Sequence, residues 1–180
     1  YPDVPMMLCS GGGARCDYEA LKYFTEFWCS DNTDPVERIY IQWGFSQFFP
    51  AKAMDAHVTS WSKATSVKFR TDVASMCKLG FDIGLKELTA DELTYCQTAV
   101  ANWKSLQSAI MDGDQYRLVS PYEGNHMALN YVSKDANKAV LFAYDIHPRL
   151  QEKLMTVKLQ GLNPNKQYKV EEINLMPSTE

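Results

Sequence analysis

The sequence lacks two features that would point to particular classes of partner. No apolar run approaches the roughly 18–20 residues that a membrane-spanning helix requires. Basic residues are not clustered either: 18 lysines and arginines are scattered among 22 acidic residues, and the formal net charge is −4. Because nucleic-acid binding leaves a basic patch in a sequence, we expect neither a nucleic acid nor a membrane as partner. The cellular compartment stays undecided.

Histidines and paired cysteine motifs are also scarce. The three histidines stand alone in the sequence, and we interpret them as structural or surface residues. The five cysteines form no Cys-x-x-Cys pair and no zinc-type pattern with a histidine. Such a set predicts neither a disulfide scaffold nor a structural metal, and buried free thiols are usually inert. We therefore expect no metal and no cofactor.

What the sequence does contain is a hydrophobic content of 46% and a regular alternation of short apolar runs with helical periodicity. Four such βα units extend over residues 4–111 and predict a parallel sheet. The expected strands are residues 4–9, 26–29, 53–57 and 81–85. The expected helices begin near residue 18, run over residues 35–49 and 66–79, and extend to about residue 111 from a capping box at Thr89 and Glu92.

The pattern changes after Asp-Gly-Asp at residues 112–114. Strand-length runs follow at residues 127–132, 139–144, 155–159 and 168–173, with connectors rich in glycine, proline and asparagine. We therefore predict an α/β fold with a boundary after residue 113, in which residues 114–180 form a small antiparallel β-sandwich-like domain. Four βα units are half of a closed (β/α)8 TIM barrel, which suggests part of a larger enzyme. An open half-barrel has two free strand edges and an apolar inner face, which predicts a homo-oligomer.

The most informative segment is CSGGGAR, residues 9–15. It closes an apolar run and opens a helical pattern, so it belongs at the carboxyl end of a strand, where parallel α/β enzymes keep their chemistry. Three consecutive glycines let the backbone approach a ligand closely, because they have no Cβ. A tight strand-to-helix connection explains the segment as well. Phosphate binding beside Arg15 is a further alternative, although neither a P-loop nor a Gly-x-Gly-x-x-Gly fingerprint is present.

A second segment, WCSDNTDPVE at residues 28–37, supplies two aspartates that differ in their surroundings. Asp34 precedes a proline, and Glu37 follows three positions later. This pattern predicts an N-cap, a proline in the first helical turn and a reciprocal capping glutamate. Asp31 has no helix to cap and follows the apolar end of a strand. If one of these carboxylates does chemistry, we expect it to be Asp31.

Together these segments resemble glycoside hydrolase family 36, the α-galactosidases and their relatives. The resemblance is carried by CSGGGAR, by the run from Trp28 to Arg38, by Met-x-Ala-His-Val at residues 54–58, and by residues 78–82 with Leu88 and Thr89. The first two segments resemble the family's glycine-rich block and its acid/base block. The resemblance covers most of residues 1–111, and the rest resembles the family's C-terminal domain. The chain departs from the pattern at Cys16, where an aromatic residue is usual.

The resemblance implies a retaining hydrolase that removes terminal α-linked galactose from oligosaccharides or glycoconjugates. Residues 1–113 would be the C-terminal half of its catalytic barrel. Asp31 matches the general acid/base, and Cys9 and Gly12 match positions that line the galactose subsite. Trp28 is a candidate for stacking on the sugar, although burial explains it equally well. In the family pattern the aspartate nucleophile belongs to an upstream strand, and no matching Lys-x-Asp block is found here.

Two other functions stay open alongside this one. The chain fits a non-catalytic half-barrel that acts in binding or assembly, and it fits a related α-N-acetylgalactosaminidase. A retaining glycosidase needs two carboxyl groups about 5–5.5 Å apart, one as nucleophile and one as acid/base. Because only the second is identified here, we expect the isolated chain to be inactive.

Overall fold

The structure is a computed structural model that describes residues 3–9, 11–61, 64–153 and 155–176. Its first sheet contains four parallel strands in the order β1-β2-β3-β4, as the alternating pattern predicts. These strands are β1 (Met7–Leu8), β2 (Glu26–Trp28), β3 (Met54–Thr59) and β4 (Lys78–Asp82). Because parallel neighbours need a crossover connection, each link returns across the same sheet, as in part of a (β/α)8 barrel.

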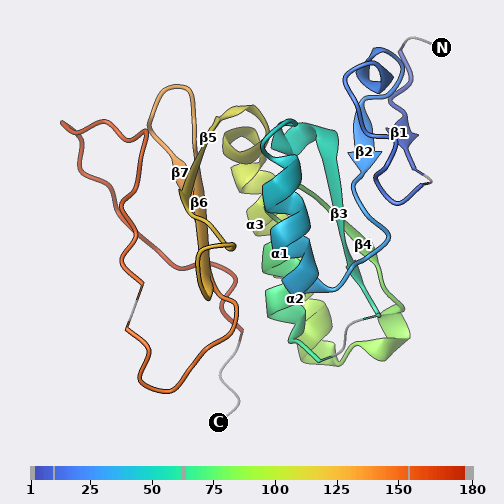
Figure 1. The fold of residues 1–180 in the computed structure, drawn as a ribbon. Coiled ribbons are helices and arrows are strands. Elements are labelled where there is room, and N and C mark those ends of the chain that lie inside the picture. The colour runs from blue at the N-terminus through green and yellow to red at the C-terminus, as the bar shows by residue number, and fades with distance from the viewer. Residues whose placement is uncertain (1–2, 10, 62–63, 154, 177–180) are drawn as a thin grey trace.

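Three α-helices lie between this sheet and a second one (Figure 1): α1 (Pro35–Phe45), α2 (Val67–Ala74) and α3 (Ala90–Asp112). Ser66 caps α2 by accepting the N–H of Phe69 at 3.1 Å. The capping box expected at Thr89 and Glu92 is present and begins α3. Within the described ranges, none of these helices is both long and apolar enough to cross a bilayer.

The first two connections differ from the prediction. After β1 the structure has only a 3-10 turn, Ala20–Lys22, instead of the expected helix, and Asp17 accepts the N–H of Ala20 at 2.8 Å. The helix expected over residues 35–49 ends at Phe45. Among the described residues, no α-helix lies between β1 and β2. Beside α1 is a pocket of about 750 Å³ whose lining includes several aromatic side chains, among them Tyr18, Tyr40, Phe45, Phe48 and Tyr122.

The fourth strand begins at Lys78 instead of residue 81, and the preceding helix ends at Ala74 instead of residue 79. Gly80 directly follows the expected end of that helix and so resembles a helix stop, but it lies within β4. The imidazole of His57 on the neighbouring strand lies against it, so that a Cβ at residue 80 would overlap the ring. Gly80 therefore permits this close packing of the His57 ring and does not end a helix.

The second sheet is antiparallel, with the order β5-β6-β7: β5 (Asp114–Val119), β6 (His126–Val132) and β7 (Ala139–Asp145). β6 and β7 confirm two of the predicted strands, whereas β5 was missed. The strands expected at residues 155–159 and 168–173 are wrong, because the described residues 155–176 contain no strand. Hydrogen bonds from side chains hold this segment in place, and not the backbone hydrogen bonds of a strand ladder. Asn130 Nδ2 donates to the carbonyl of Gln160 at 3.0 Å, and the Tyr168 hydroxyl donates to the carbonyl of Ala136 at 2.7 Å.

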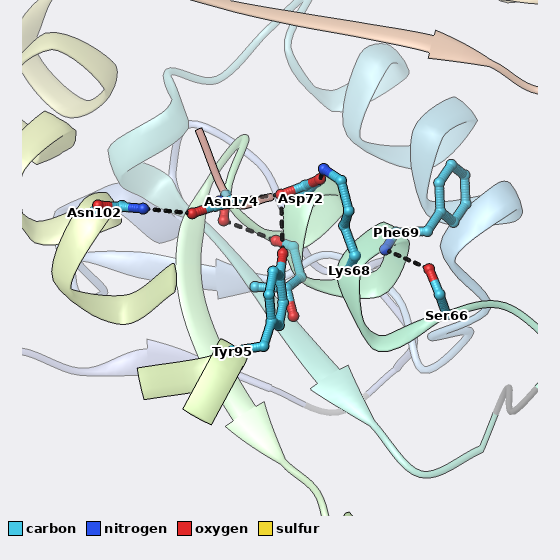
Figure 2. Close-up of polar contacts among 9 residues, drawn as sticks. Ser66, Lys68, Phe69, Asp72, Tyr95, Asn102 and Asn174 are labelled. Carbon is cyan, nitrogen blue, oxygen red and sulfur yellow. Dashed lines mark hydrogen bonds and ion pairs between the residues drawn. The ribbon is translucent and has the colours of Figure 1, made fainter. Parts of the chain in front are cut away.

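Asn174 anchors the end of that segment to two helices (Figure 2). Its Nδ2 donates to Asp72 Oδ1 of α2 at 3.1 Å, and its Oδ1 accepts from Asn102 Nδ2 of α3 at 2.8 Å. Asp72 also accepts from the Tyr95 hydroxyl at 3.4 Å and pairs with Lys68 at 2.6 Å. The backbone of Asn174 has a φ of 57°, a left-handed conformation in which asparagine is enriched. The segment is thus tied to α2 and α3 by hydrogen bonds at one point.

Both sheets share one hydrophobic core with the helices. Its buried members include Phe27, Met54 and Val58 from the first sheet, Ile39, Val73 and Ile110 from α1, α2 and α3, and Met127, Leu129 and Tyr131 from the second sheet. The hydroxyl of Tyr131 crosses the layers and donates to the carbonyl of Met76 at 2.8 Å. The domain boundary after residue 113 stays a prediction.

The face of the first sheet that points away from the helices is polar, so the apolar inner face that we expected is wrong. The strand register aligns Trp28, Asp55 and Lys78 on this face, opposite to core residues such as Met54. Glu26 pairs with Lys78 across it. Charged groups on an inner sheet face disfavour a simple apolar contact between two copies.

Exposed apolar side chains lie instead beside the edge strand β1, where Val4, Met6 and Met7 are 52%, 42% and 40% exposed. The expected homo-oligomer therefore stays a prediction, and residues 1–60, which include this edge, are the part of the chain through which we expect it to form. Light scattering of the 180-residue chain at micromolar concentration is expected to show a dimer or a larger assembly. A stable monomer that binds no hydrophobic dye would contradict it.

Candidate active site

The glycine-rich segment lies at the carboxyl end of β1, with Gly11, Gly12 and Gly13 at φ values of 81°, 56° and 85°. L-residues with side chains rarely adopt this left-handed conformation. Gly13 also lies against the end of β2, where a Cβ would overlap the carbonyl oxygen of Cys29. Glycine is therefore required at residue 13 both by its backbone angle and by the contact, and this contact brings the two sequence segments together.

Asp31 lies in the loop after β2, with its two carboxylate oxygens in different surroundings. Oδ1 accepts a hydrogen bond from the Trp28 indole Nε1 at 2.9 Å. Oδ2 points toward the glycine-rich segment, since a Cβ at Gly12 would be 3.8 Å from it and would meet nothing else within 4 Å. Oδ1 is thus fixed by a hydrogen bond, and Oδ2 faces the backbone of Gly12.

The other predicted residues lie around this carboxylate. Cys9 follows β1 directly and is exposed, and extending the β1–β2 register by one residue places it beside Trp28. The Trp28 ring contacts the His57 imidazole with centroids 4.6 Å apart, and the Arg38 guanidinium carbon lies 5.1 Å from the ring centroid. The structure therefore brings together all four predicted site residues, and it packs the indole against protein groups.

Asp34 is the N-cap of α1, as predicted, because its Oδ1 accepts the N–H groups of Val36 at 2.9 Å and Glu37 at 3.1 Å. The reciprocal hydrogen bond to the N–H of Asp34, which we expected from Glu37, comes from another residue. The N–H of Asp34 donates to Asn32 Oδ1 at 3.0 Å, so Asn32 takes the part that we expected of Glu37. The carboxylate of Asp34 is thereby engaged in starting the helix, and that of Asp31 is not.

Replacing Asp34 is expected to affect stability and not chemistry. Asp34→Ser keeps an oxygen that accepts the same N–H groups, so it should change the free energy of unfolding little. Asp34→Ala should lower it by about 0.5–2 kcal/mol. Urea denaturation of the two variants measures the difference. Equal destabilisation by serine and alanine would contradict the capping role.

Arg38 was not predicted as part of this site, although it organises the loop that carries Asp31. It is 3% exposed and donates from Nη1 to the carbonyl of Ser30 at 3.1 Å and from Nη2 to the carbonyl of Asp55 at 2.6 Å. Its Nε donates to Gln42 Oε1 at 3.2 Å. In the sequence, Arg38 is the last residue of the run that resembles the family's acid/base block, and it lies on the buried face of α1. The hydrogen bonds of Arg38 fix the β2–α1 loop to the neighbouring strand.

Asp55 is a second residue that the sequence analysis missed. Its side chain has a buried Oδ2 with no hydrogen-bond partner among the described residues, and the residue is 7% exposed. Burial raises the pKa of Asp55 to about 6, although the Arg38 charge opposes this shift. Burial also lowers the pKa of His57, which Asp82 partly offsets. Both effects favour the neutral forms of these side chains on the inner face.

The raised pKa of Asp55 gives stability a definite pH dependence. Because the folded chain holds this proton to a higher pH than the unfolded chain, stability should fall as pH rises from about 4 to about 6 and then level off. Asp55→Asn removes the buried charge and should raise the free energy of unfolding at pH 7 by roughly 1–3 kcal/mol. Denaturation at pH 4 and pH 7 measures this, and the gain should nearly vanish at pH 4. An equal effect at both pH values would contradict it.

The thiols inside the fold offer no nucleophile. Burial raises the pKa of Cys29 to about 12, and burial also raises that of Cys77. A thiol with so high a pKa carries almost no thiolate at neutral pH. Cys29 and Cys77 are therefore not candidates for a nucleophile at neutral pH.

Comparison with known families agrees with this geometry. Residues 1–113 match the melibiase family model, and residues 126–178 match the model of the glycosyl hydrolase family 36 C-terminal domain. The chain belongs to the melibiases of glycoside hydrolase family 36. It is 35% identical over 176 residues to the α-galactosidase AgaA of Geobacillus stearothermophilus. It is 37% identical over 177 residues to the probable α-galactosidase C of Aspergillus oryzae.

Solved structures of family 36 enzymes have the same fold over most of this chain. A crystal structure of AgaA covers 88% of the chain with a TM-score of 0.84, and the Lactobacillus brevis α-galactosidase covers 92% with a TM-score of 0.86. Variants of AgaA have been solved with raffinose and with stachyose. The alignments with AgaA and with the A. oryzae protein include 95% of this chain but only 24% of each relative. It thus spans about a quarter of the length of these curated relatives.

Proposed function

We propose that this family 36 chain is part of a retaining α-galactosidase and that Asp31 is its general acid/base. The observation that carries the proposal is the Asp31 carboxyl itself. Trp28 binds one of its oxygens, and the other faces the glycine-rich segment at Gly12. A group that transfers a proton must be held in a fixed direction and have one atom free to reach substrate. Asp31 satisfies both conditions.

In the first half of the reaction, Asp31 gives its proton to the glycosidic oxygen as the bond to the anomeric carbon breaks. A nucleophilic carboxylate attacks that carbon from the opposite face. In the second half Asp31 takes a proton from water, and the water oxygen attacks the anomeric carbon and displaces the carboxylate. The family resemblance implies that this nucleophile lies on a strand upstream of the four strands described here.

The remaining residues of the site orient the Asp31 carboxyl or line the space beside it. Trp28 orients the Asp31 carboxyl, and Arg38 holds the loop through the carbonyl of Ser30. Gly12 leaves room for a galactose ring beside Asp31 because it has no Cβ, and Cys9 lines the same subsite from the end of β1. In this arrangement the indole binds the catalytic carboxylate and is not primarily a sugar-stacking platform.

The test compares the longer polypeptide that carries this chain with the 180-residue chain alone. The longer polypeptide should release galactose from raffinose and from an aryl α-galactoside. The chain alone should show negligible turnover, because loss of one catalytic group removes most of a rate enhancement. Preference for an N-acetylgalactosaminide, or no hydrolysis at all, would replace the proposal with one of the two alternatives. Turnover by the chain alone within about tenfold of the longer form would contradict the shared active site.

A further inference from the structure

A cluster of three potential metal ligands lies at the end of the second sheet, apart from the candidate active site. His126 opens β6 and Asp145 closes β7, and the strand register pairs the two residues. The distance from His126 Nε2 to Asp145 Oδ1 is 3.9 Å. Beyond this pair, the N–H of Ile146 donates to the carbonyl of Asn125 at 2.7 Å. The backbone on both sides of the pair is therefore fixed by hydrogen bonds.

The third group comes from the turn that follows β7. Glu152 lies close enough that one ligand atom from each of Glu152, His126 and Asp145 falls within 4.8 Å of the others. Asn125 Nδ2 donates to both carboxylate oxygens of Glu152, at 3.1 and 3.5 Å, and so holds this carboxylate near the pair. Among the described residues, neither Asp145 nor Glu152 forms an ion pair with a lysine or arginine. Two carboxylates thus converge without a fixed cation to balance them.

We propose that His126, Asp145 and Glu152 bind a divalent transition-metal ion of the zinc class. One imidazole nitrogen and two carboxylate oxygens are a ligand set that such ions accept, with water completing the coordination. Metal–ligand bonds of about 2.0–2.2 Å place tetrahedral ligand atoms roughly 3.4 Å apart. The 3.9 Å between His126 and Asp145 is near this value, and small rotations of the exposed carboxylates of Asp145 and Glu152 would bring their oxygens closer, with one Glu152 oxygen still accepting from Asn125.

The ion would cross-link the ends of β6 and β7 to the chain that follows them. This location has a structural consequence, since residues 155–176 have no strand of their own and are joined to the rest of the fold by side-chain hydrogen bonds such as those of Asn130, Tyr168 and Asn174. Among the described residues, no hydrogen bond or ion pair joins His126, Asp145 or Glu152 to the Asp31 loop. The site is therefore separate from the proposed glycosidase reaction. In sequence, His126 stands alone, and only the pairing of β6 with β7 brings Asp145 beside it.

Titration calorimetry of the 180-residue chain with zinc chloride at neutral pH tests the proposal. We expect one ion per chain, with a raised midpoint of thermal unfolding. His126→Ala should weaken binding at least about tenfold, and so should Asp145→Asn. His147→Ala removes a nearby exposed histidine outside the cluster and should leave binding unchanged.

The exposed thiol of Cys9 is a competing zinc ligand, so the same titration is run on Cys9→Ser. Cobalt(II) added in place of zinc should give a spectrum without thiolate-to-metal charge transfer, because only nitrogen and oxygen atoms coordinate it. Binding that survives in Cys9→Ser and is lost in His126→Ala supports the site. No binding at millimolar zinc, or binding lost with Cys9 and kept without His126, would overturn it.

Discussion

Asp31→Asn in the longer family 36 polypeptide is expected to lower kcat/KM for an α-galactoside with a poor leaving group by about 10²–10⁴-fold. An amide cannot give up the proton that the departing oxygen needs. An aryl α-galactoside whose leaving group is already a good one should lose much less, because its departure needs little protonation. The measurement is kcat/KM for a series of aryl galactosides of different leaving-group pKa, compared between wild type and variant.

The matched control for this series is Asp34→Ser, which changes the neighbouring aspartate of the same loop. It keeps the helix cap, so kcat/KM should stay close to wild type across all leaving groups. Equal losses for good and poor leaving groups in Asp31→Asn would show that Asp31 is not the acid. A selective loss in Asp34→Ser would show that the two aspartates have the opposite roles.

Gly13→Ala is expected to destabilise the chain by more than about 2 kcal/mol. The added Cβ would overlap the carbonyl oxygen of Cys29, and the residue would have to keep a φ of 85°. Because the overlap is with the backbone of Cys29, the glycine-rich segment would have to move away from the end of β2, and with it Gly12 from Asp31. In the longer polypeptide the same substitution should therefore also lower turnover.

Gly44→Ala provides the matched control for that substitution. Gly44 lies inside α1, and a Cβ there would meet nothing within 4 Å. Since glycine in a helix interior is less favourable than alanine by roughly 0.5–1 kcal/mol, this variant should be slightly more stable than wild type. Thermal or urea denaturation of both variants gives the comparison. A Gly13→Ala chain as stable as Gly44→Ala would contradict the close contact between the two segments.

The sequence predicted the parts of this fold that local chemistry determines. Asp34 and Thr89 cap helices where their side chains reach the first free N–H groups, and short apolar runs mark β2, β3, β6 and β7. The glycine-rich and aspartate segments were expected at the carboxyl ends of strands, and the structure places them there. Side-by-side strands then bring these two segments together without any long-range signal in the sequence.

The parts that were missed depend on contacts between distant residues. Gly80 resembled a helix stop, yet it is a strand residue that pairs with His57 of β3. Residues 155–159 and 168–173 alternate like strands but find no strand to pair with in the described structure. Arg38 and Asp55 escaped notice because their roles follow from burial beside each other, 17 positions apart. Periodicity describes one element at a time and carries no information about such partners.

Rescue of an Asp31→Ala variant by azide tests the central claim most directly. Azide attacks the anomeric carbon without needing a base to remove a proton, so it bypasses the second role proposed for Asp31. Azide should accelerate turnover of an activated aryl α-galactoside by the variant in the longer polypeptide, and the product should be α-galactosyl azide with retained configuration. Absence of any acceleration would contradict the acid/base assignment, and a β-galactosyl azide product would show that Asp31 is the nucleophile instead.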